Sequence, residues 1–313
     1  MMKNIDIAII GAGPAGLAAG QYCARAGLHC VIFDGAMSGG QSLLIETLDN
    51  YPGILSINGF DFAQIMEQQA KDFGVEFVLG MVESVTQRDK KHVIQLRSGD
   101  TYEAYAVIIA TGARYALLGV EGEERLFGKG VSYCATCDGP FFKNKPILVV
   151  GGGDTAFTDA LYLSGLSHRI VLIHRRDKFR AQHYLVERVL QNPNIELRTF
   201  TELRAILGAT NVERVQLWHN QEHREYEEEF AAVFIFVGTN PQTELFPYLE
   251  KTDTGYIKTN DKLESSIKGI YAAGDVRDTE FRQVVTACAD GALAAHKAGE
   301  YVGDLKYEEQ LKD

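Results

Sequence analysis

Apolar residues gather in short continuous runs along the chain, and several of these runs lead directly into glycine. The first run covers residues 5–10 and is followed by Gly11-Ala12-Gly13-Pro14-Ala15-Gly16. Helical spacing continues over residues 14–25, and a second apolar run over residues 30–33 ends at Asp34. Runs of this length, bounded by turn residues and separated by a helix, predict buried parallel strands in an α/β unit.

The same pattern occurs a second time further along the chain. Residues 146–150 predict a strand, residues 151–156 (GGGDTA) its turn, residues 157–164 a helix, and residues 170–173 the next strand, which ends at His174. The offset from the first glycine to the strand-end residue is 23 in both copies, from 11 to 34 and from 151 to 174. This equal spacing indicates an internal duplication of a nucleotide-binding unit.

The remaining apolar pattern predicts that one unit is inserted in the other. Residues 269–275 form another strand-to-glycine turn, and a helix of small residues is expected from 284 to 301. We therefore expect an α/β fold with two Rossmann-like domains, covering residues 1–114 plus 245–313 and residues 115–244. The linkers are expected at 113–119 and from 239 onward. Further expected elements are a helix at 60–73 and strands at 75–79, 81–85, 93–96, 107–109 and 232–237.

Composition narrows the possible partners. The chain has 313 residues with 46% hydrophobic content, enough for two domains, and a net charge of −11 that argues against nucleic acid or an anionic membrane. No apolar run reaches the length of a membrane span, and the N-terminus leads into a strand and not a signal peptide, so a cytoplasmic protein is expected. Cys23, Cys30 and Cys288 stand singly in apolar patterns and are interpreted as buried small hydrophobes.

The two remaining cysteines form the motif with the clearest chemistry. Cys134-Ala135-Thr136-Cys137-Asp138 places two thiols one helical turn apart, with a carboxylate directly after them. At the first turn of a helix, unpaired N–H groups favour the reactive thiolate. Half of a zinc site or an inert pair are the alternatives, but no second Cys-x-x-Cys or His-x-x-x-His is present. The motif therefore predicts a redox dithiol and no metal site.

The two nucleotide-binding copies differ at the residue that would contact the ribose. Asp34 would bond a free 2′-hydroxyl and repel a 2′-phosphate. His174-Arg175-Arg176, with Lys178 and Arg180, is a positive cluster in an acidic chain and predicts NADPH in the second site. The alternative is that these cations only solvate a loop. By elimination the first site takes a dinucleotide without a 2′-phosphate, and FAD fits a chain that joins a hydride donor to a dithiol.

Taken together, the motifs resemble those of the low-molecular-weight (bacterial-type) thioredoxin reductases. The resemblance extends over essentially the whole chain, and the combination of CATCDG with HRR is its most specific part. The matching stretches are GAGPAG at Gly11, GGQ at Gly39, CATCDG at Cys134, GGGDTA at Gly151, HRRDKFRA at His174, AAGDV at Ala272 and FRQVVTACADG ending at Gly291.

The resemblance implies a homodimeric class II pyridine nucleotide-disulfide oxidoreductase that passes a hydride from NADPH to FAD and then reduces a disulfide and thioredoxin. It implies that Cys137 faces the flavin, Cys134 exchanges with thioredoxin, and Asp138 is the acid/base. The implied FAD contacts are Gly11, Gly13, Pro14, Ala15, Gly16, Asp34, Gly40, Gln41, Asn50, Val82, Ala110, Thr111, Gly112, Gly274, Asp275, Arg282, Gln283 and Val284. The implied NADPH contacts are Gly153, Asp154, Thr155, His174, Arg175, Arg176, Arg180 and Gly238.

One departure from the family pattern concerns two acids. Where the family usually has two glutamates after GGGxxAx, this chain has Thr158-Asp159. The substitution puts in doubt any role of those acids in contacts between the domains or in tuning the site. The substitution does not affect the dithiol or the cationic cluster at 174–180.

The order of the motifs also predicts a motion. The dithiol and the second nucleotide site lie in the same domain, and both must reach one isoalloxazine carried by the other domain. A hinge rotation about linkers near 113–119 and 239–246 is therefore expected.

Other functions fit parts of the sequence. The chain could reduce another thioredoxin-like or peroxidase-linked carrier, or it could be a flavin NAD(P)H oxidase or ferredoxin-linked reductase that does not use the cysteines. A nucleotide-sensing scaffold is the alternative without catalysis.

Overall fold

The computed structural model describes residues 2–45 and 47–311, which divide into two compact units. Unit 1 contains residues 1–114 and 240–313, and unit 2 contains residues 115–239. Unit 1 thus resumes at Asn240, whereas the sequence pattern suggested residue 245. The reason lies in residues that follow Asn240: the backbone N–H of Gln242 donates to the carbonyl of Gly112 at 2.9 Å, which joins this stretch to unit 1.

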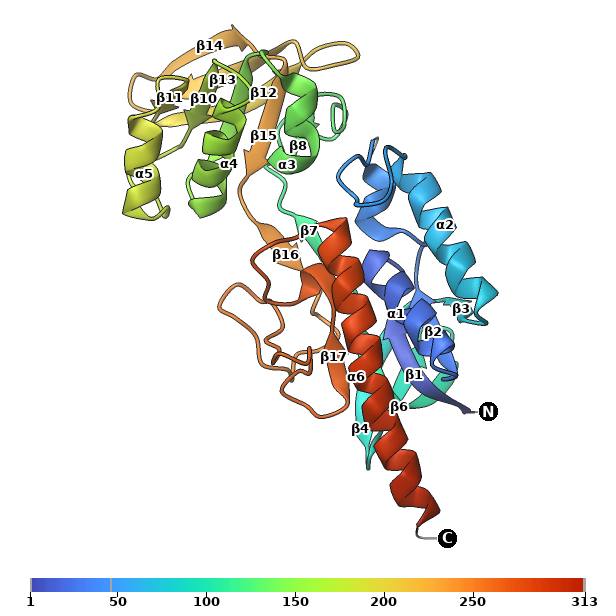
Figure 1. The fold of residues 1–313 in the computed structure, drawn as a ribbon. Coiled ribbons are helices and arrows are strands. Elements are labelled where there is room, and N and C mark those ends of the chain that lie inside the picture. Colours follow the sequence, from blue (N-terminus) through green and yellow to red (C-terminus); the bar gives the residue numbers. More distant parts are fainter. Residues whose placement is uncertain (1, 46, 312–313) are drawn as a thin grey trace. The chain divides into compact units, whose positions relative to one another are not determined.

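Unit 1 is built on a seven-stranded sheet with the order β3-β2-β1-β6-β5-β4, in which β17 also pairs with β6 (Figure 1). Strands β1, β2, β3, β6 and β17 are parallel, and β4 and β5 form an antiparallel hairpin that extends the sheet from β6. The elements are β1 (Lys3–Ile10), α1 (Pro14–Arg25), β2 (Cys30–Asp34), the 3₁₀ helix η1 (Gly40–Leu44), α2 (Gly59–Asp72), β3 (Glu76–Leu79), β4 (Val82–Arg88), β5 (Lys91–Leu96), β6 (Thr101–Ile109), β17 (Ile270–Ala272), the 3₁₀ helix η3 (Gly274–Val276) and α6 (Val284–Gln310).

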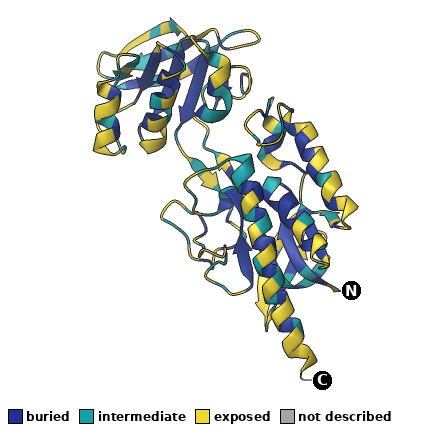
Figure 2. Cartoon of the chain, in the orientation of Figure 1, coloured by how far each residue is buried: buried dark blue, intermediate teal, exposed yellow. Residues whose placement is uncertain are grey.

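Strand β1 shows why its run of apolar residues is continuous. Ile7 and Ile9 point to one face of the sheet and pack with buried residues of α1, α2 and α6. Ala8 and Ile10 point to the other face, into a second core with Phe246 and residues of β4 and β5. Because successive side chains of a strand alternate between the faces, a strand covered on both sides must be apolar throughout. Figure 2 shows the sheet as the most buried part of the unit.

Unit 2 has a five-stranded parallel sheet with the order β11-β10-β9-β15-β8. Helices pack on one face of this sheet, and an antiparallel meander of β12, β13 and β14 covers the other. The elements are β8 (Val131–Ser132), α3 (Ala135–Asp138), the 3₁₀ helix η2 (Gly139–Phe142), β9 (Ile147–Gly151), α4 (Asp154–Ser164), β10 (Ile170–Ile173), α5 (His183–Leu190), β11 (Ile195–Arg198), β12 (Thr201–Leu207), β13 (Arg214–His219), β14 (Arg224–Glu229) and β15 (Ala232–Phe236).

Two short strands connect the units. Strands β7 (Ala113–Tyr115) and β16 (Thr239–Pro241) pair with each other in a separate two-stranded sheet. The backbone N–H of Ala116 also donates to the carbonyl of Gly238 at 3.0 Å. The chain therefore enters and leaves unit 2 through neighbouring strands.

The structure confirms the α/β fold with two Rossmann-like sheets and most of the expected elements. Helix α6 differs, because it continues nine residues beyond the expected end at 301, to Gln310. Cys23, Cys30 and Cys288 are free and buried, as expected. Among the described residues, no helix combines the length and the apolar character that a membrane crossing would need.

Candidate functional site

The two cysteines of the motif are joined by a disulfide, with their Cα atoms 5.3 Å apart. Cys134 is the N-cap of α3, and its Sγ accepts the backbone N–H of Cys137 at 3.3 Å. Both cysteines and Asp138 are partly exposed, and Asp138 ends the helix before Gly139-Pro140 begins the 3₁₀ turn. The structure thus places both sulfurs at the amino end of α3 and near solvent, as disulfide exchange requires.

The first glycine-rich turn is shaped by close backbone approaches at the carboxyl ends of β1 and β6. A Cβ on Gly11, whose φ is +108°, would lie 2.3 Å from the carbonyl oxygen of Ala110. A Cβ on Gly16 would lie 1.8 Å from the carbonyl oxygen of Gly11, so helix α1 can start this close only with glycine there. The Asp34 carboxylate accepts the N–H of Ala12 at 2.7 Å and fixes the turn against the end of β2.

Several of the expected FAD-contacting residues, distant in the sequence, meet at this edge of the sheet. Gly40 approaches Gly13, since a Cβ on Gly40 would lie 3.2 Å from the Cα of Gly13. The Asn50 amide donates to the side-chain oxygen of Gln283 at 3.2 Å. Gly274 lies against α1, where its Cβ would be 3.0 Å from that of Ala15.

Other expected residues are placed as follows. Thr111 and Gly112 bond to the backbone of Gln242, and Val284 starts α6 directly after Gln283. Val82 is buried in the core at the start of β4, so its side chain is not available to a ligand. Pro14 occupies the first turn of α1, and Gln41 lies in η1.

Two ionisable groups at this edge are taken out of water. Burial raises the pKa of Asp275 to about 6, although the charge of Arg282 opposes this. The guanidinium of Arg282 lies over the ring of Tyr256, 4.2 Å from its centroid. Its Nε is buried and has no hydrogen-bond partner. A buried donor without a partner is costly, so Arg282 is positioned to bond a ligand.

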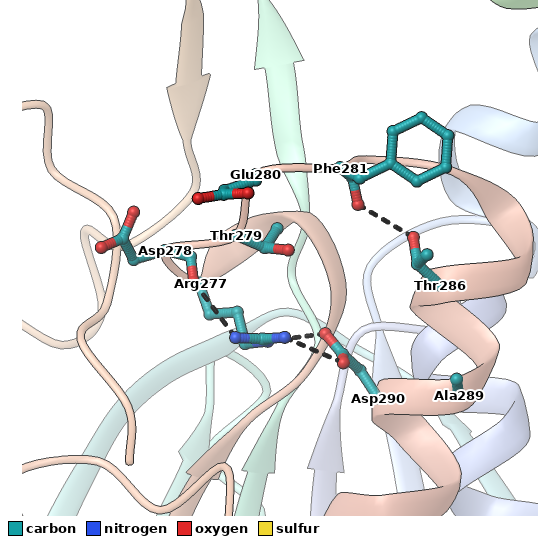
Figure 3. Close-up of a pocket in the computed structure, with 8 residues that line it drawn as sticks. All are labelled: Arg277, Asp278, Thr279, Glu280, Phe281, Thr286, Ala289 and Asp290. Carbon is teal, nitrogen blue, oxygen red and sulfur yellow. Dashed lines mark hydrogen bonds and ion pairs between the residues drawn. The ribbon is translucent and has the colours of Figure 1, made fainter. Parts of the chain in front are cut away.

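An open pocket of about 650 Å³ lies beside this part of unit 1, in the segment before α6 and along its first turns (Figure 3). Arg277 forms a two-pronged ion pair with Asp290, with contacts of 2.6 and 3.0 Å. The Thr286 hydroxyl donates to the carbonyl of Phe281 at 3.0 Å. Arg277, Asp290 and Thr286 thus bond to neighbouring residues of the chain, and the described residues that line the pocket include no cysteine. We therefore place the functional site at the disulfide and the two glycine-rich turns.

The second nucleotide-binding turn lies in unit 2, between β9 and α4. A Cβ on Gly152 would lie 2.2 Å from Cε1 of His174 and 2.4 Å from its Nδ1, so the imidazole covers this glycine. Gly153, the N-cap of α4, has open space where its Cβ would be. A backbone hydrogen bond also stabilises the loop, because Arg180 donates its N–H to the carbonyl of Gly152 at 2.8 Å.

The cationic cluster predicted from the sequence gathers beside this turn. Burial lowers the pKa of His174, and the charges of the neighbouring arginines act in the same direction. His174 is therefore neutral near pH 7 while Arg175, Arg176 and Arg180 carry the positive charge. Gly238 follows β15 with φ +127° and bonds to Ala116.

Sequence reasoning missed one participant in this turn. Gln182 donates its backbone N–H to Oδ1 of Asp154 at 2.7 Å and its side-chain amide to Oδ2 at 2.9 Å. The carboxylate of Asp154 is therefore engaged by α5, which leaves Thr155 as the exposed hydroxyl at the start of α4. No local pattern marks Gln182, because its partner is 28 residues away.

The acid that departs from the family pattern lies on α4. Asp159 is partly buried, and desolvation raises its pKa to about 6, while Thr158 is exposed. Asp159 is thus in an environment that disfavours its charged form.

Comparison with known proteins agrees with this geometry. The family model of pyridine nucleotide-disulphide oxidoreductases matches residues 5–291. A thioredoxin reductase of Treponema pallidum (strain Nichols) is 47% identical over 98% of this chain and 100% of its own length. One from Bacillus subtilis (strain 168) is 41% identical over 99% and 98%. The crystal structure of a thioredoxin reductase from Streptococcus pyogenes MGAS5005 superposes with a TM-score of 0.92 at 38% identity, covering 97% and 100%.

Proposed function

Because the chain belongs to the thioredoxin reductases of the pyridine nucleotide-disulphide oxidoreductase family, we propose that it uses NADPH and FAD to reduce the disulfide of thioredoxin. It is an oxidoreductase that acts on a sulfur group. The observation that carries the proposal is the Cys134–Cys137 disulfide at the start of α3, in the same unit as the cationic nucleotide site. A dithiol and a nicotinamide site in one unit fit transfer of electrons from NADPH to a protein disulfide.

FAD fits the first nucleotide site. The close approaches at Gly11 and Gly16 bring the amino end of α1 to the end of β1, where the backbone N–H groups of its first turn would hold a pyrophosphate. The unpartnered Nε of Arg282 would supply a further donor to the ligand. We propose that the turn at 11–16, Asp34, Gly40, Gln41 and Asn50 hold FAD. The remaining proposed contacts are Val82 through its backbone, residues 110–112, Gly274, Asp275 and residues 282–284.

NADPH fits the second site. The neutral imidazole of His174 and the guanidinium groups of Arg175, Arg176 and Arg180 surround the end of β10, where a 2′-phosphate would lie. Gly153 leaves room for close approach of a pyrophosphate to α4. We propose that residues 153–155, His174, the three arginines and Gly238 hold NADPH. Bound NADPH would supply the hydride, and bound FAD would supply the two-electron chemistry that links it to the Cys134–Cys137 disulfide.

The protein's own residues then carry out the thiol exchange. We propose that the thiolate of Cys134 attacks one sulfur of the thioredoxin disulfide, so that the disulfide breaks and a mixed disulfide forms. Asp138 provides the proton for the departing thiolate, and its carboxylate then accepts the proton of the Cys137 thiol. The resulting Cys137 thiolate attacks Cys134 Sγ and breaks the mixed disulfide. The second thioredoxin sulfur leaves as a thiolate that takes this proton from Asp138, so that dithiol thioredoxin is released and the Cys134–Cys137 disulfide is restored. Each cycle thus moves two electrons and two protons, and the N–H of Cys137 stabilises negative charge on Cys134.

The residues proposed for FAD belong to unit 1, whereas the dithiol and the residues proposed for NADPH belong to unit 2. We therefore propose that unit 2 rotates about the linkers near 113–119 and 239–246 during turnover. A solution measurement that found one fixed geometry throughout turnover would contradict this motion.

We further propose that the enzyme works as a homodimer in the cytoplasm, as the family resemblance implies. Analytical ultracentrifugation should then give a mass of about twice the 34.6 kDa of one chain. A measured mass of 34.6 kDa at micromolar concentration would contradict the dimer.

The decisive experiment follows NADPH oxidation by the purified yellow protein with thioredoxin as acceptor. A Cys134→Ser, Cys137→Ser double variant should lose thioredoxin reduction while NADPH still bleaches its flavin. An oxidase or ferredoxin-linked reductase would keep its activity in this variant, and a nucleotide-sensing scaffold would show no bleaching. Comparing thioredoxin with thioredoxin-like and peroxidase-linked carriers identifies the preferred acceptor.

A further inference from the structure

Glu123 is a buried carboxylate outside both nucleotide sites, with 1% of its surface exposed. Its Oε1 accepts the N–H of Leu118 at 3.0 Å and the hydroxyl of Tyr133 at 2.9 Å. Its Oε2 accepts the N–H of Gly119 at 2.7 Å and that of Val120 at 3.3 Å. A buried charge is tolerated only when its hydrogen-bonding capacity is used, and here four donors use it. The carboxylate thus joins the turn at 118–120 to Tyr133.

Tyr133 is the residue directly before the redox-active Cys134. Its ring stacks on Tyr115 with the centroids 4.9 Å apart and tilts against Phe127 at 5.5 Å. Burial and the bond to Glu123 raise the pKa of Tyr133, so its hydroxyl remains a proton donor over the working pH range. The side chain is therefore fixed both by ring packing and by a charge-assisted hydrogen bond.

The other neighbour of Tyr133 holds the backbone of Cys134. The Ser132 hydroxyl accepts the N–H of Cys134 at 3.1 Å and donates to its carbonyl at 3.3 Å. Ser132 is itself the last residue of β8, which pairs with β15 in the sheet. Cys134 therefore follows two anchored residues, and its extended backbone (φ −139°, ψ 103°) directs Sγ to the N–H of Cys137.

Glu123 in turn rests on a rigid part of unit 2. The backbone N–H of Ile206 in β12 donates to the carbonyl of Glu121 at 2.8 Å. A Cβ on Gly122 would lie 2.0 Å from the carbonyl oxygen of Ile206, so the segment lies directly against the strand. Arg125 adds a hydrogen bond of 2.9 Å to the carbonyl of Gly208. The meander thus fixes the position from which Glu123 holds Tyr133.

We propose that Glu123 and Tyr133 are positioning residues for Cys134, an inference that rests on the proposed function. In the oxidised enzyme the disulfide itself fixes both sulfurs. After reduction this restraint is gone, and the Glu123–Tyr133 bond, together with Ser132, keeps the Cys134 thiolate at the amino end of α3. Because Tyr115 and the turn at 118–120 belong to the first connection between the units, the same bond ties that connection to the reacting sulfur.

The test uses the FAD-loaded, full-length protein with Tyr133→Phe, which removes the hydroxyl and keeps the stacked ring. The first readout is the rate at which iodoacetamide alkylates Cys134 in the reduced enzyme, followed by mass spectrometry as a function of pH. With a less well-held thiolate, the midpoint of this profile should rise by roughly 0.5 to 1 pH unit, the equivalent of one lost hydrogen bond. The kcat/KM for thioredoxin should fall roughly three- to tenfold.

A second variant and a control sharpen the test. Glu123→Gln removes the charge that strengthens this bond, so it should shift the profile in the same direction. The Glu123→Gln, Tyr133→Phe double variant should shift the profile no further than the larger single effect, since both substitutions act on the same bond. Tyr184→Phe, a tyrosine on α5 with 53% of its surface exposed, is the matched control and should match the wild type. If Glu123→Gln does not fold, Tyr133→Phe decides alone.

The outcomes separate this inference from the proposed function. An alkylation profile unchanged in Tyr133→Phe overturns the inference, even if the unfolding temperature falls, because a purely structural role would lower stability alone. Additive shifts in the double variant would likewise show that the two residues do not act together. The alkylation profile needs no thioredoxin, so it remains decisive even if the wild-type enzyme fails to reduce thioredoxin and the proposed function falls.

Discussion

Gly152→Ala gives a direct test of the proposed NADPH site. The added methyl group would lie 2.2 Å from Cε1 of His174, 2.4 Å from Nδ1 and 2.8 Å from Nε2. Contacts this short cannot persist, and the imidazole is the movable end of a side chain, so it should swing away. The backbone can remain in place, because Gly152 does not need a positive φ.

The displaced imidazole should cost the enzyme one hydrogen bond to the 2′-phosphate. A hydrogen bond to a charged group contributes about 1.5 to 3 kcal/mol. The lower end applies here, since His174 is neutral in the free enzyme and must take up a proton to bind as a cation. We therefore expect the KM for NADPH to rise about tenfold, with kcat changed little.

The assay compares NADPH and NADH as donors at saturating thioredoxin. Only NADPH carries the 2′-phosphate, so the KM for NADH should change much less and the preference for NADPH should shrink. Gly303→Ala, on α6 with nothing within 4 Å of the new Cβ, is the matched control. Equal increases for both nucleotides would show that the loop itself was distorted, and an unchanged KM for NADPH would refute the role of His174.

Three further predictions concern single side chains. Arg282→Leu should lower the content of bound FAD, measured by absorbance after gel filtration, because the buried Nε loses its role as a ligand donor; retention of full FAD content would contradict this. His92, buried in unit 1 with an unpartnered Nδ1, has its pKa lowered to about 4 by burial. As the pH falls from about 6.5 toward 4, the unfolded chain binds a proton at His92 and the folded protein does not, so the free energy of unfolding decreases. In His92→Leu, the decrease in the urea-unfolding free energy between pH 7 and 4.5 should be smaller by about 2 kcal/mol. Burial raises the pKa of Asp159 to about 6. Between about pH 4 and 6 the unfolded chain releases this proton more readily than the folded protein, so the free energy of unfolding falls over this range and is constant above it. Asp159→Asn should therefore stabilise the protein at pH 7 by about 3 kcal/mol, and an equal gain at pH 4 would show that charge is not the cause.

Sequence reasoning succeeded where a local pattern carries the structural requirement. The turn at Gly11 and the strand that ends at Asp34 could be predicted, because a close strand-to-helix turn demands glycine at fixed positions. The Cys-x-x-Cys motif likewise predicted a helix start with both thiols on it, and the structure confirms Cys134 as the N-cap.

The elements that the sequence did not predict depend on contacts between segments far apart in the chain. The meander of β12, β13 and β14 was not expected, because β14 reads REYEEE and lacks the apolar alternation of a half-buried strand. The last nine residues of α6 were missed for a similar reason. Ion pairs of Lys306 with Asp6 and of Glu308 with Lys90, together with the bond from the Tyr105 hydroxyl to Glu309, stabilise them from the sheet.

The Glu123–Tyr133 bond could not be predicted from either residue. Glutamate is mostly a surface residue, and nothing in the local sequence shows that four donors converge on this one. Only the fold of the segment from 115 to 133 around β12 brings the carboxylate under the hydroxyl.

The pairing of β7 with β16 has a consequence for the history of such proteins. The chain enters unit 2 through β7 and leaves it through the paired strand β16, and Ala116 is bonded to Gly238. Unit 2 is therefore inserted at one position in the sequence of unit 1. A module whose termini meet can be exchanged, duplicated or excised without re-threading the sheet that carries it. A single recombination event is therefore sufficient to add the Cys134–Cys137 disulfide and the proposed NADPH site to a precursor of unit 1.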